Sequence, residues 1–113
     1  MKIVRGNEVT KEKMSEGITA IEYPTKDSDI NLAIIEINGR YPKTARVMNQ
    51  KCKELAHVFE GKGKIFVNDN QIDLEENDQI LIEPGEKYYW QGHLKLAIAC
   101  TPTWYPEQSN KVD

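Results

Sequence analysis

The short spacing between turn signals is the feature that most restricts the fold of this chain. After residue 18, short apolar stretches alternate with polar turns, and a turn signal recurs about every six to twelve residues. The clearest signals are Asn38-Gly39, Asn68-Asp69-Asn70, Glu75-Glu76-Asn77-Asp78 and Pro84-Gly85. Short strands joined by such turns are typical of all-β sandwiches and barrels, whereas helices need longer uninterrupted segments. We therefore expect eight or nine short strands and little helix.

Length and composition limit the organisation and the partners of the chain. Its 113 residues fit one domain, 1–113, and the hydrophobic fraction of 39% is sufficient for one modest core. The formal net charge is −3, a poor electrostatic match for nucleic acid or an anionic membrane surface. No apolar run approaches the ~20 residues of a membrane-spanning helix. We expect neither nucleic-acid nor membrane partners.

The cysteines and histidines show no metal-binding or disulfide pattern. Cys52 and Cys100 are far apart, with no CxxC spacing, and no secretion signal follows Met1. We expect two reduced thiols in a cytoplasmic protein. His57 and His93 also stand alone, so there is no HxH or HExxH motif.

The expected strands follow from these signals. Residues 1–16 are expected to form a short arm of strand or turn, and residues 30–37 are apolar enough for a strand buried on both sides. We expect Asn38-Gly39 to end that strand and Gly61-Lys62-Gly63 to end the strand over 54–60. Gln91-Gly92-His93 is expected to separate two further strands, and the chain is expected to end in a polar tail.

Glycines and acidic residues in the middle of the chain carry a family resemblance. Glu54 and Gly61 have a spacing of seven residues, Gly61-Lys62-Gly63 gives a G-x-G turn, and Asp78 and Pro84-Gly85 follow. Over about residues 30–101 this pattern resembles the two motifs of the cupin family. The resemblance implies a cupin-like double-stranded β-helix, which is a jelly-roll barrel, preceded by a short N-terminal arm.

The resemblance also implies that the metal-binding residues of the family are replaced in this chain. The family's three metal-binding histidines fall on Met48, Gln50 and Tyr88, and its glutamate on Glu54. Thioether, amide and phenol groups are poor ligands for Zn²⁺, Fe²⁺ or Mn²⁺. We therefore expect no metal and no cofactor, and a polar pocket floor where the family has its metal. A metal held instead by His57, His93 or Cys52 is the alternative.

Strand alternation then predicts the pocket. Arg46, Met48 and Gln50 share one face, which the motif assigns to the barrel interior, and Tyr88 and Trp90 share a face opposite. A carboxylate inside a barrel needs hydrogen-bond donors, which Arg46, Gln50 or Tyr88 could supply to Glu54. The predicted ligand-binding residues are Arg46, Met48, Gln50, Glu54, Tyr88 and Trp90.

These residues favour a protein that binds a small polar or sugar-like molecule without a metal. One alternative is an enzyme: an isomerase, epimerase or lyase with Glu54 and Tyr88 as catalytic acid and base, or a metal-dependent oxygenase with an unusual ligand set. Another is a structural or partner-binding subunit with a filled barrel. An open pocket would favour binding or catalysis.

We also expect a homodimer. Cupin-like barrels often pair through their outer sheet, and the chain has more aromatic residues than a small core needs. The edge of the N-terminal strands and the arm containing Trp104-Tyr105 are the candidate surfaces. In a twofold dimer the same patch is used on both chains.

Overall fold

The computed structural model describes residues 1–113, and nearly all of its regular structure is β. Two one-turn 3₁₀ helices, η1 (Gly6–Glu8) and η2 (Pro106–Gln108), are the exceptions. The all-β prediction is confirmed. The structure contains no helix with the length and hydrophobicity that a membrane span requires. The nine strands are β1 (Thr10–Ser15), β2 (Ile18–Glu22), β3 (Asn31–Tyr41), β4 (Arg46–Asn49), β5 (Lys53–Val67), β6 (Asn70–Leu74), β7 (Gln79–Ile82), β8 (Lys87–Thr101) and β9 (Ser109–Val112).

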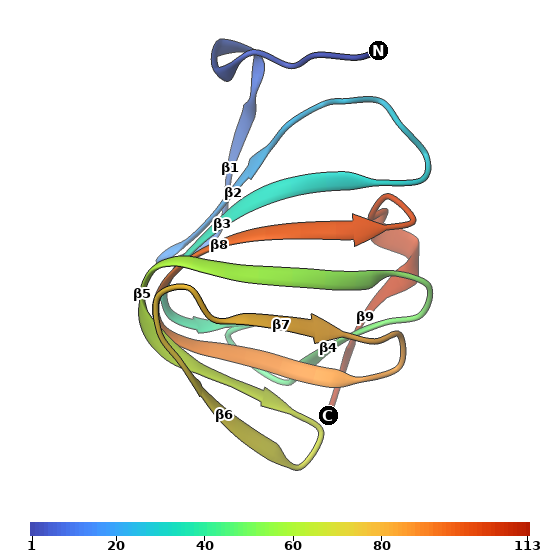
Figure 1. Ribbon diagram of the computed structural model, residues 1–113. Coiled ribbons are helices and arrows are strands. Elements are labelled where there is room, and N and C mark those ends of the chain that lie inside the picture. The colour runs from blue at the N-terminus through green and yellow to red at the C-terminus, as the bar shows by residue number, and fades with distance from the viewer.

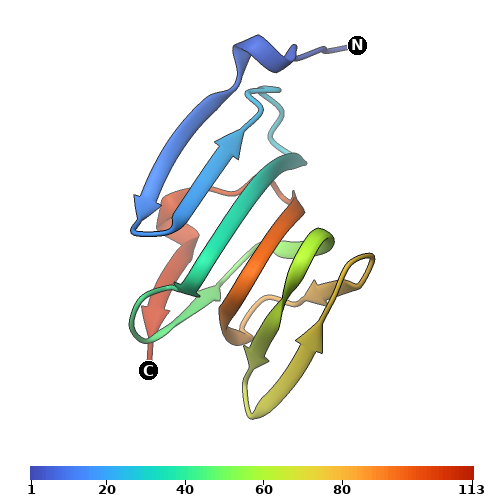
Figure 2. The ribbon, with the colours of Figure 1, turned by 90° about the vertical axis from the view of Figure 1, so that its left-hand side faces the viewer.

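All nine strands belong to one antiparallel sheet that curls around an interior (Figure 1). The long strands β5 and β8 form its central pair from Lys53↔Thr101 to Val67↔Tyr88, with a shift of register between Val58 and Glu60. Strand β3 pairs with the other edge of β8, and β2 and β1 extend the sheet beyond β3, as Figure 2 shows. Strands β6 and β7 pair with β5, while β4 pairs with the start of β8 and with β9.

The sheet bends where three glycines lie in register. Gly39 of β3 is opposite Gly92 of β8, which is opposite Gly63 of β5. Gly92 has a φ of +133°, and a Cβ added there would lie 2.5 Å from the Gly63 Cα. Because glycine has no side chain, the backbones of the three strands can approach closely and bend at this row. A larger residue would not fit there.

This row corrects three boundary predictions. Asn38-Gly39, Gly61-Lys62-Gly63 and Gln91-Gly92-His93 do not end strands, because β3, β5 and β8 each continue through them. A glycine pattern of this kind marks a turn or a bend equally well, and only the pairing with a neighbouring strand distinguishes the two.

The other predicted turns are confirmed. Asn68 (φ +52°) and Asp69 make a tight turn closed by the pair Val67↔Asn70. Asp78 Oδ2 accepts a hydrogen bond from the Glu75 amide at 2.8 Å across the next turn. Pro84-Gly85 is a turn in which Gly85 has a φ of +87°. Asparagine and glycine tolerate these positive φ values at low cost.

The two ends of the chain are strands as well. The N-terminal arm contains β1, which pairs with β2. The predicted polar tail also forms a strand, because Ser109–Val112 is β9 and pairs with β4. An edge strand of four mostly polar residues has no hydrophobic alternation, so the sequence pattern does not indicate it.

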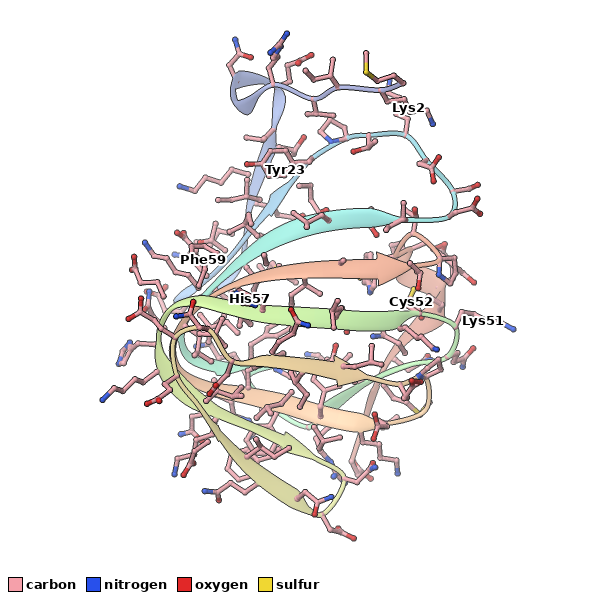
Figure 3. All side chains as sticks on the ribbon, in the orientation of Figure 1. Lys2, Tyr23, Lys51, Cys52, His57 and Phe59 are labelled. Atoms are coloured by element: carbon pink, nitrogen blue, oxygen red, sulfur yellow. The ribbon has the colours of Figure 1, made fainter.

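The core fills the inside of the curl. Its fully buried side chains include Ile18, Ile37, Ile65, Leu96 and Trp90. The outer face is more exposed, and Phe59 of β5 is 42% exposed there. Figure 3 shows Phe59 on the side of the molecule where the strands curl over, and Cys52, which precedes β5, on the other side. Beside this core, the inside of the curl also contains a cavity, which reaches the arm that follows β8.

Candidate functional site

A cavity of about 390 Å³ opens inside the curled sheet. Strands β1 to β5 and β8 contribute to its wall, and the arm after β8 adds Trp104 and Pro106. Most of the lining is apolar, including Ala33, Ile35, Val47, Trp90 and Ile98. The size is at the lower end for small-molecule sites.

Glu54 is the buried polar group of this cavity, with 8% of its surface exposed. Its Oε1 accepts hydrogen bonds from the Tyr88 hydroxyl and from Asn49 Nδ2, the latter at 2.7 Å. Its Oε2 is contacted by the Cys100 thiol at 3.5 Å. A thiol is a weak donor, so Oε2 retains capacity to accept a stronger hydrogen bond.

The bend of β8 creates this arrangement. Tyr88 and Cys100 are near opposite ends of the same strand and would be about 40 Å apart if the strand were straight. Both nevertheless contact Glu54. The glycine row at Gly92 therefore folds β8 over so that its two ends approach one carboxyl group.

A second layer of hydrogen bonds fixes Asn49. Gln108, which is 1% exposed, donates to Asn49 Oδ1 at 3.0 Å. Its Oε1 accepts hydrogen bonds from the amides of Lys51 and Cys52, both at 3.2 Å. The segment before β9 thus closes the loop between β4 and β5 and orients the Asn49 amide toward Glu54.

Burial controls the protonation of the neighbouring groups. Burial and then the Glu54 charge raise the pKa of Tyr88 well above its ordinary value, and in the same way raise the pKa of Tyr41 to about 12. The same two causes raise the pKa of Cys100. At neutral pH the two phenols and the thiol keep their protons, so none of them is a nucleophile. Tyr88 and Cys100 use their protons to donate to Glu54.

Three of the six predicted ligand-binding residues lie at this cavity. Glu54, Tyr88 and Trp90 line it, and the predicted hydrogen bond between Tyr88 and Glu54 is present. Arg46, Met48 and Gln50 do not line it. Gln50 is exposed, and the Arg46 guanidinium donates to the Asp113 carbonyl at 2.7 Å and the Asn68 carbonyl at 3.0 Å.

The interior position predicted for Arg46, Met48 and Gln50 is therefore wrong. In β4 the buried residues are Val47 and Asn49, which is the opposite face. Gln50 to Cys52 lie between β4 and β5 and are not paired as a strand, so alternation cannot be counted back through them from Glu54. A shift of one residue exchanges the two faces of a strand.

Sequence reasoning missed four residues of the site. Asn49 could have been found from the alternation within β4, had the correct face been chosen. Gln108 could not, because it comes from a tail with no recognisable pattern. Tyr41 lines the cavity from the end of β3, beyond the predicted end of that strand. Cys100 is at a strand end, where a thiol is more often a packing residue.

The donor set does not fit the metal that cupin proteins commonly hold. Glu54 is surrounded by a phenol, an amide and a thiol with a raised pKa. No three His, Cys, Asp or Glu side chains are placed to hold a metal ion. Borderline metals need several imidazole, carboxylate or thiolate ligands, and the residues around Glu54 do not supply them.

Solved structures with the same arrangement of strands identify the fold family. The structure of Pac13, described as a nucleoside dehydratase, superposes with a TM-score of 0.89 at 14% identity, over 99% of this chain and 91% of that one. A cupin from Shewanella frigidimarina of the RmlC-like type superposes with a TM-score of 0.73 at 14% identity, over 88% of each chain. The chain has the cupin fold.

Other cupin-fold structures agree with this assignment. KdgF from a Halomonas species superposes with a TM-score of 0.73 at 9% identity, over 90% of this chain and 95% of that one. A Streptomyces Pac13 variant solved with uridine gives a TM-score of 0.88 at 14% identity, over 98% of this chain and 90% of that one. No protein-family model matches the chain, and no curated protein matches it in sequence.

Proposed function

We propose that the chain binds a small polar molecule of nucleoside size in the cavity, with Glu54 as the polar anchor. The observation that carries this proposal is one buried carboxyl group in a mostly apolar wall, with its Oε2 contacted by a weak donor alone. Apolar pockets with a few directed polar groups are the usual design of small-molecule sites. A ligand hydroxyl or N–H group would donate to Oε2.

The walls suit a flat ring. Trp90 and Trp104 both line the cavity, and aromatic faces stack on sugar rings and bases. The neighbouring Pac13 structure with uridine makes a nucleoside the first ligand to test. The alternative of a subunit with a filled barrel has less support, because the cavity of about 390 Å³ leaves the interior open.

A second candidate function is acid–base catalysis by Glu54 and Tyr88, and their direct hydrogen bond favours it. In an elimination of water, Glu54 would accept a proton from a ligand carbon while the C–O bond at the adjacent carbon breaks. Tyr88, whose pKa is raised, would give its proton to the departing hydroxyl, so that water leaves and a C=C bond forms. The proton on Glu54 would then pass back to Tyr88 through their hydrogen bond.

Calorimetric titration with uridine tests the binding proposal. We expect saturable binding to the wild-type chain and at least about tenfold weaker binding to Glu54→Gln, because an amide in place of Oε2 no longer accepts. For the variant Tyr88→Phe, which is used in the catalytic test below, Tyr89→Phe is the matched control. Tyr89 is not at the cavity, and its ring stacks on Phe66 with the ring centroids 4.3 Å apart. Equal binding to the wild type and Glu54→Gln would contradict the proposal.

Mass spectrometry separates binding from catalysis. Loss of one water from an added nucleoside by the wild type, and not by Tyr88→Phe, would support the elimination. Binding with no change in the nucleoside would leave binding as the function and reject this reaction for that ligand.

We also propose a cytoplasmic location for the chain. Cys52 and Cys100 are both buried and unpaired, which is typical of proteins kept in a reducing compartment. Thiol titration of freshly purified, denatured protein without reductant should count two thiols per chain. A count of zero would contradict the location.

A further inference from the structure

The charged side chains that line the cavity are all acidic. Glu12 of β1, Glu22 of β2 and Glu54 of β5 lie on its wall, and no lysine, arginine or histidine does. The whole chain is close to balanced, with 15 basic and 18 acidic residues. The cavity is therefore much more acidic than the chain as a whole.

Strand alternation produces this separation of charge. Within β1, Glu12 and Met14 line the cavity, while Lys11 and Lys13 are on the opposite face. Lys13 forms an ion pair with Glu16 at 3.1 Å, away from the cavity. The nearest lysines in sequence thus cannot neutralise Glu12 from inside.

Glu12 and Glu22 are neighbours on the adjacent strands β1 and β2. Glu12 is paired with Ala20 and Glu22 with Thr10, so the two carboxyl groups are diagonal neighbours on one face of the sheet. Burial and then the Glu12 charge raise the pKa of Glu22. Two carboxyl groups held together with no cation beside them repel a third negative charge.

The three carboxyl groups extend from the surface to the interior. Glu12 is exposed, Glu22 is half-buried and Glu54 is buried. Glu54 and, more weakly, Glu22 both raise the pKa of the Cys100 thiol, which places that thiol in the field of both carboxyl groups. An anion entering the cavity would meet negative charge at every depth.

We propose that Glu12 and Glu22 form a charge filter through which the cavity accepts uncharged or cationic ring molecules and rejects anions. The inference rests on the proposed function, and it makes the ligand a nucleoside and not its 5′-phosphate. Specificity of this kind comes from an unfavourable interaction with the wrong ligand, and it needs no added contact with the right one.

Intrinsic fluorescence gives a direct test, because the chain has two tryptophans and both line the cavity. The probes are benzyl alcohol, benzylamine and benzoate, which share one ring and differ in charge. Uridine and its 5′-phosphate form a second pair. The variants are the double variant Glu12→Gln/Glu22→Gln and the single variant Glu22→Gln. Glu76→Gln, in the exposed turn between β6 and β7, controls for the change in net charge.

We expect benzoate to bind the wild type at least about tenfold more weakly than benzyl alcohol, because like charges repel strongly in a partly buried site. The double variant should remove most of that difference, chiefly by tightening the binding of benzoate. Glu76→Gln should behave as the wild type. The same ratio is expected for uridine 5′-phosphate against uridine.

The outcomes separate this inference from the proposed function. If benzoate and benzyl alcohol bind the wild type equally, or if the double and single variants both keep the wild-type ratio, the charge filter is wrong while binding in the cavity stands. If the ring probes show the expected ratio but uridine does not bind, the filter stands and the nucleoside is the wrong ligand. Absence of binding by every probe would contradict both.

Discussion

Tyr88 and Asn49 share the task of satisfying one oxygen of Glu54 inside the barrel. Removing the phenol oxygen by Tyr88→Phe leaves a buried carboxyl group with one strong donor. We predict a loss of about 1–3 kcal/mol in the free energy of unfolding, which is the usual cost of an unmade buried hydrogen bond. Urea denaturation at neutral pH measures it.

Two further variants test the cause of this loss. Tyr89→Phe removes a hydroxyl from the next residue, which lies away from the cavity, and should change stability by less than about 0.5 kcal/mol. Glu54→Gln should also be mild, because the amide oxygen still accepts from Tyr88 and Asn49. Equal losses in Tyr88→Phe and Tyr89→Phe would show that the hydrogen bond to Glu54 is not responsible.

Tyr41 makes stability depend on alkaline pH. Burial and then the Glu54 charge raise its pKa from 10.0 to about 12 in the folded state. Below pH 10 the phenol is protonated in both states, so its contribution is intact. Between about pH 10 and 12 the unfolded chain loses this proton while the folded chain keeps it, so the free energy of unfolding falls as pH rises.

The corresponding measurement is the free energy of unfolding from about pH 8 to pH 12 in the wild type and in Tyr41→Phe. The variant should lose stability less steeply above pH 10, since one of the phenols with a raised pKa is absent. A slope identical to that of the wild type would contradict the raised pKa.

Single residues also show which parts of the site the sequence could predict. Glu54 and Tyr88 could be predicted because each is anchored by a nearby framework signal, the Glu54–Gly61 spacing and the Pro84-Gly85 turn. Gln108 could not, because its role depends on the tail returning to pair with β4. Contacts between segments this far apart leave no local periodicity to read.

At the scale of the element, β4 and β8 show what alternation can and cannot decide. Within β8 every second residue from Tyr88 to Cys100 faces the interior, apart from Gly92 at the bend. Between β4 and β5 the unpaired residues Gln50 to Cys52 break the alternation, so the faces of Met48 and Gln50 could not be inferred from Glu54. Periodicity shows which residues share a face within one strand, but it cannot be counted through a loop into the next strand.

The glycine row gives the element-scale prediction. In Gly92→Ala the new Cβ would lie 2.5 Å from the Gly63 Cα and 2.8 Å from the Lys62 carbonyl oxygen, at a φ of +133°. We predict a loss of more than about 2 kcal/mol in the free energy of unfolding, because backbone atoms cannot move aside as a side chain could. Thermal denaturation followed by circular dichroism measures the change.

Gly6→Ala is the control for that experiment, because no atom lies within 4 Å of an added Cβ at Gly6. It should melt within about two degrees of the wild type. Near-wild-type stability of Gly92→Ala would mean that β5 and β8 do not pack this closely at the bend.

At the scale of the whole molecule, an apolar row crosses the outer face of the sheet. Leu32 of β3, Leu55 of β5 and Leu81 of β7 are aligned through Ala99 of β8, and the three leucines are 41%, 39% and 48% exposed. Contiguous apolar surface of this kind is typical of an interface between chains. We propose that a twofold homodimer uses this face.

Light scattering at about tens of micromolar should give twice the mass of one chain. Leu55→Asp should give a monomer with unchanged circular dichroism, because its side chain points outward. Ile72→Asp, at an exposed position of β6, should remain dimeric. A monomeric wild type would contradict the dimer and leave the cavity unaffected.

Chemical-shift mapping by NMR with uridine tests binding in the cavity most directly. Trp90, Trp104 and Asn49 carry side-chain N–H groups at or beside the cavity, and Leu55 and Leu81 report on the outer face. Saturable shifts of the two indole resonances and of the Asn49 side-chain amide, with the outer-face amides unmoved, are the predicted result. Shifts confined to Leu55, Leu81 and their neighbours would contradict it.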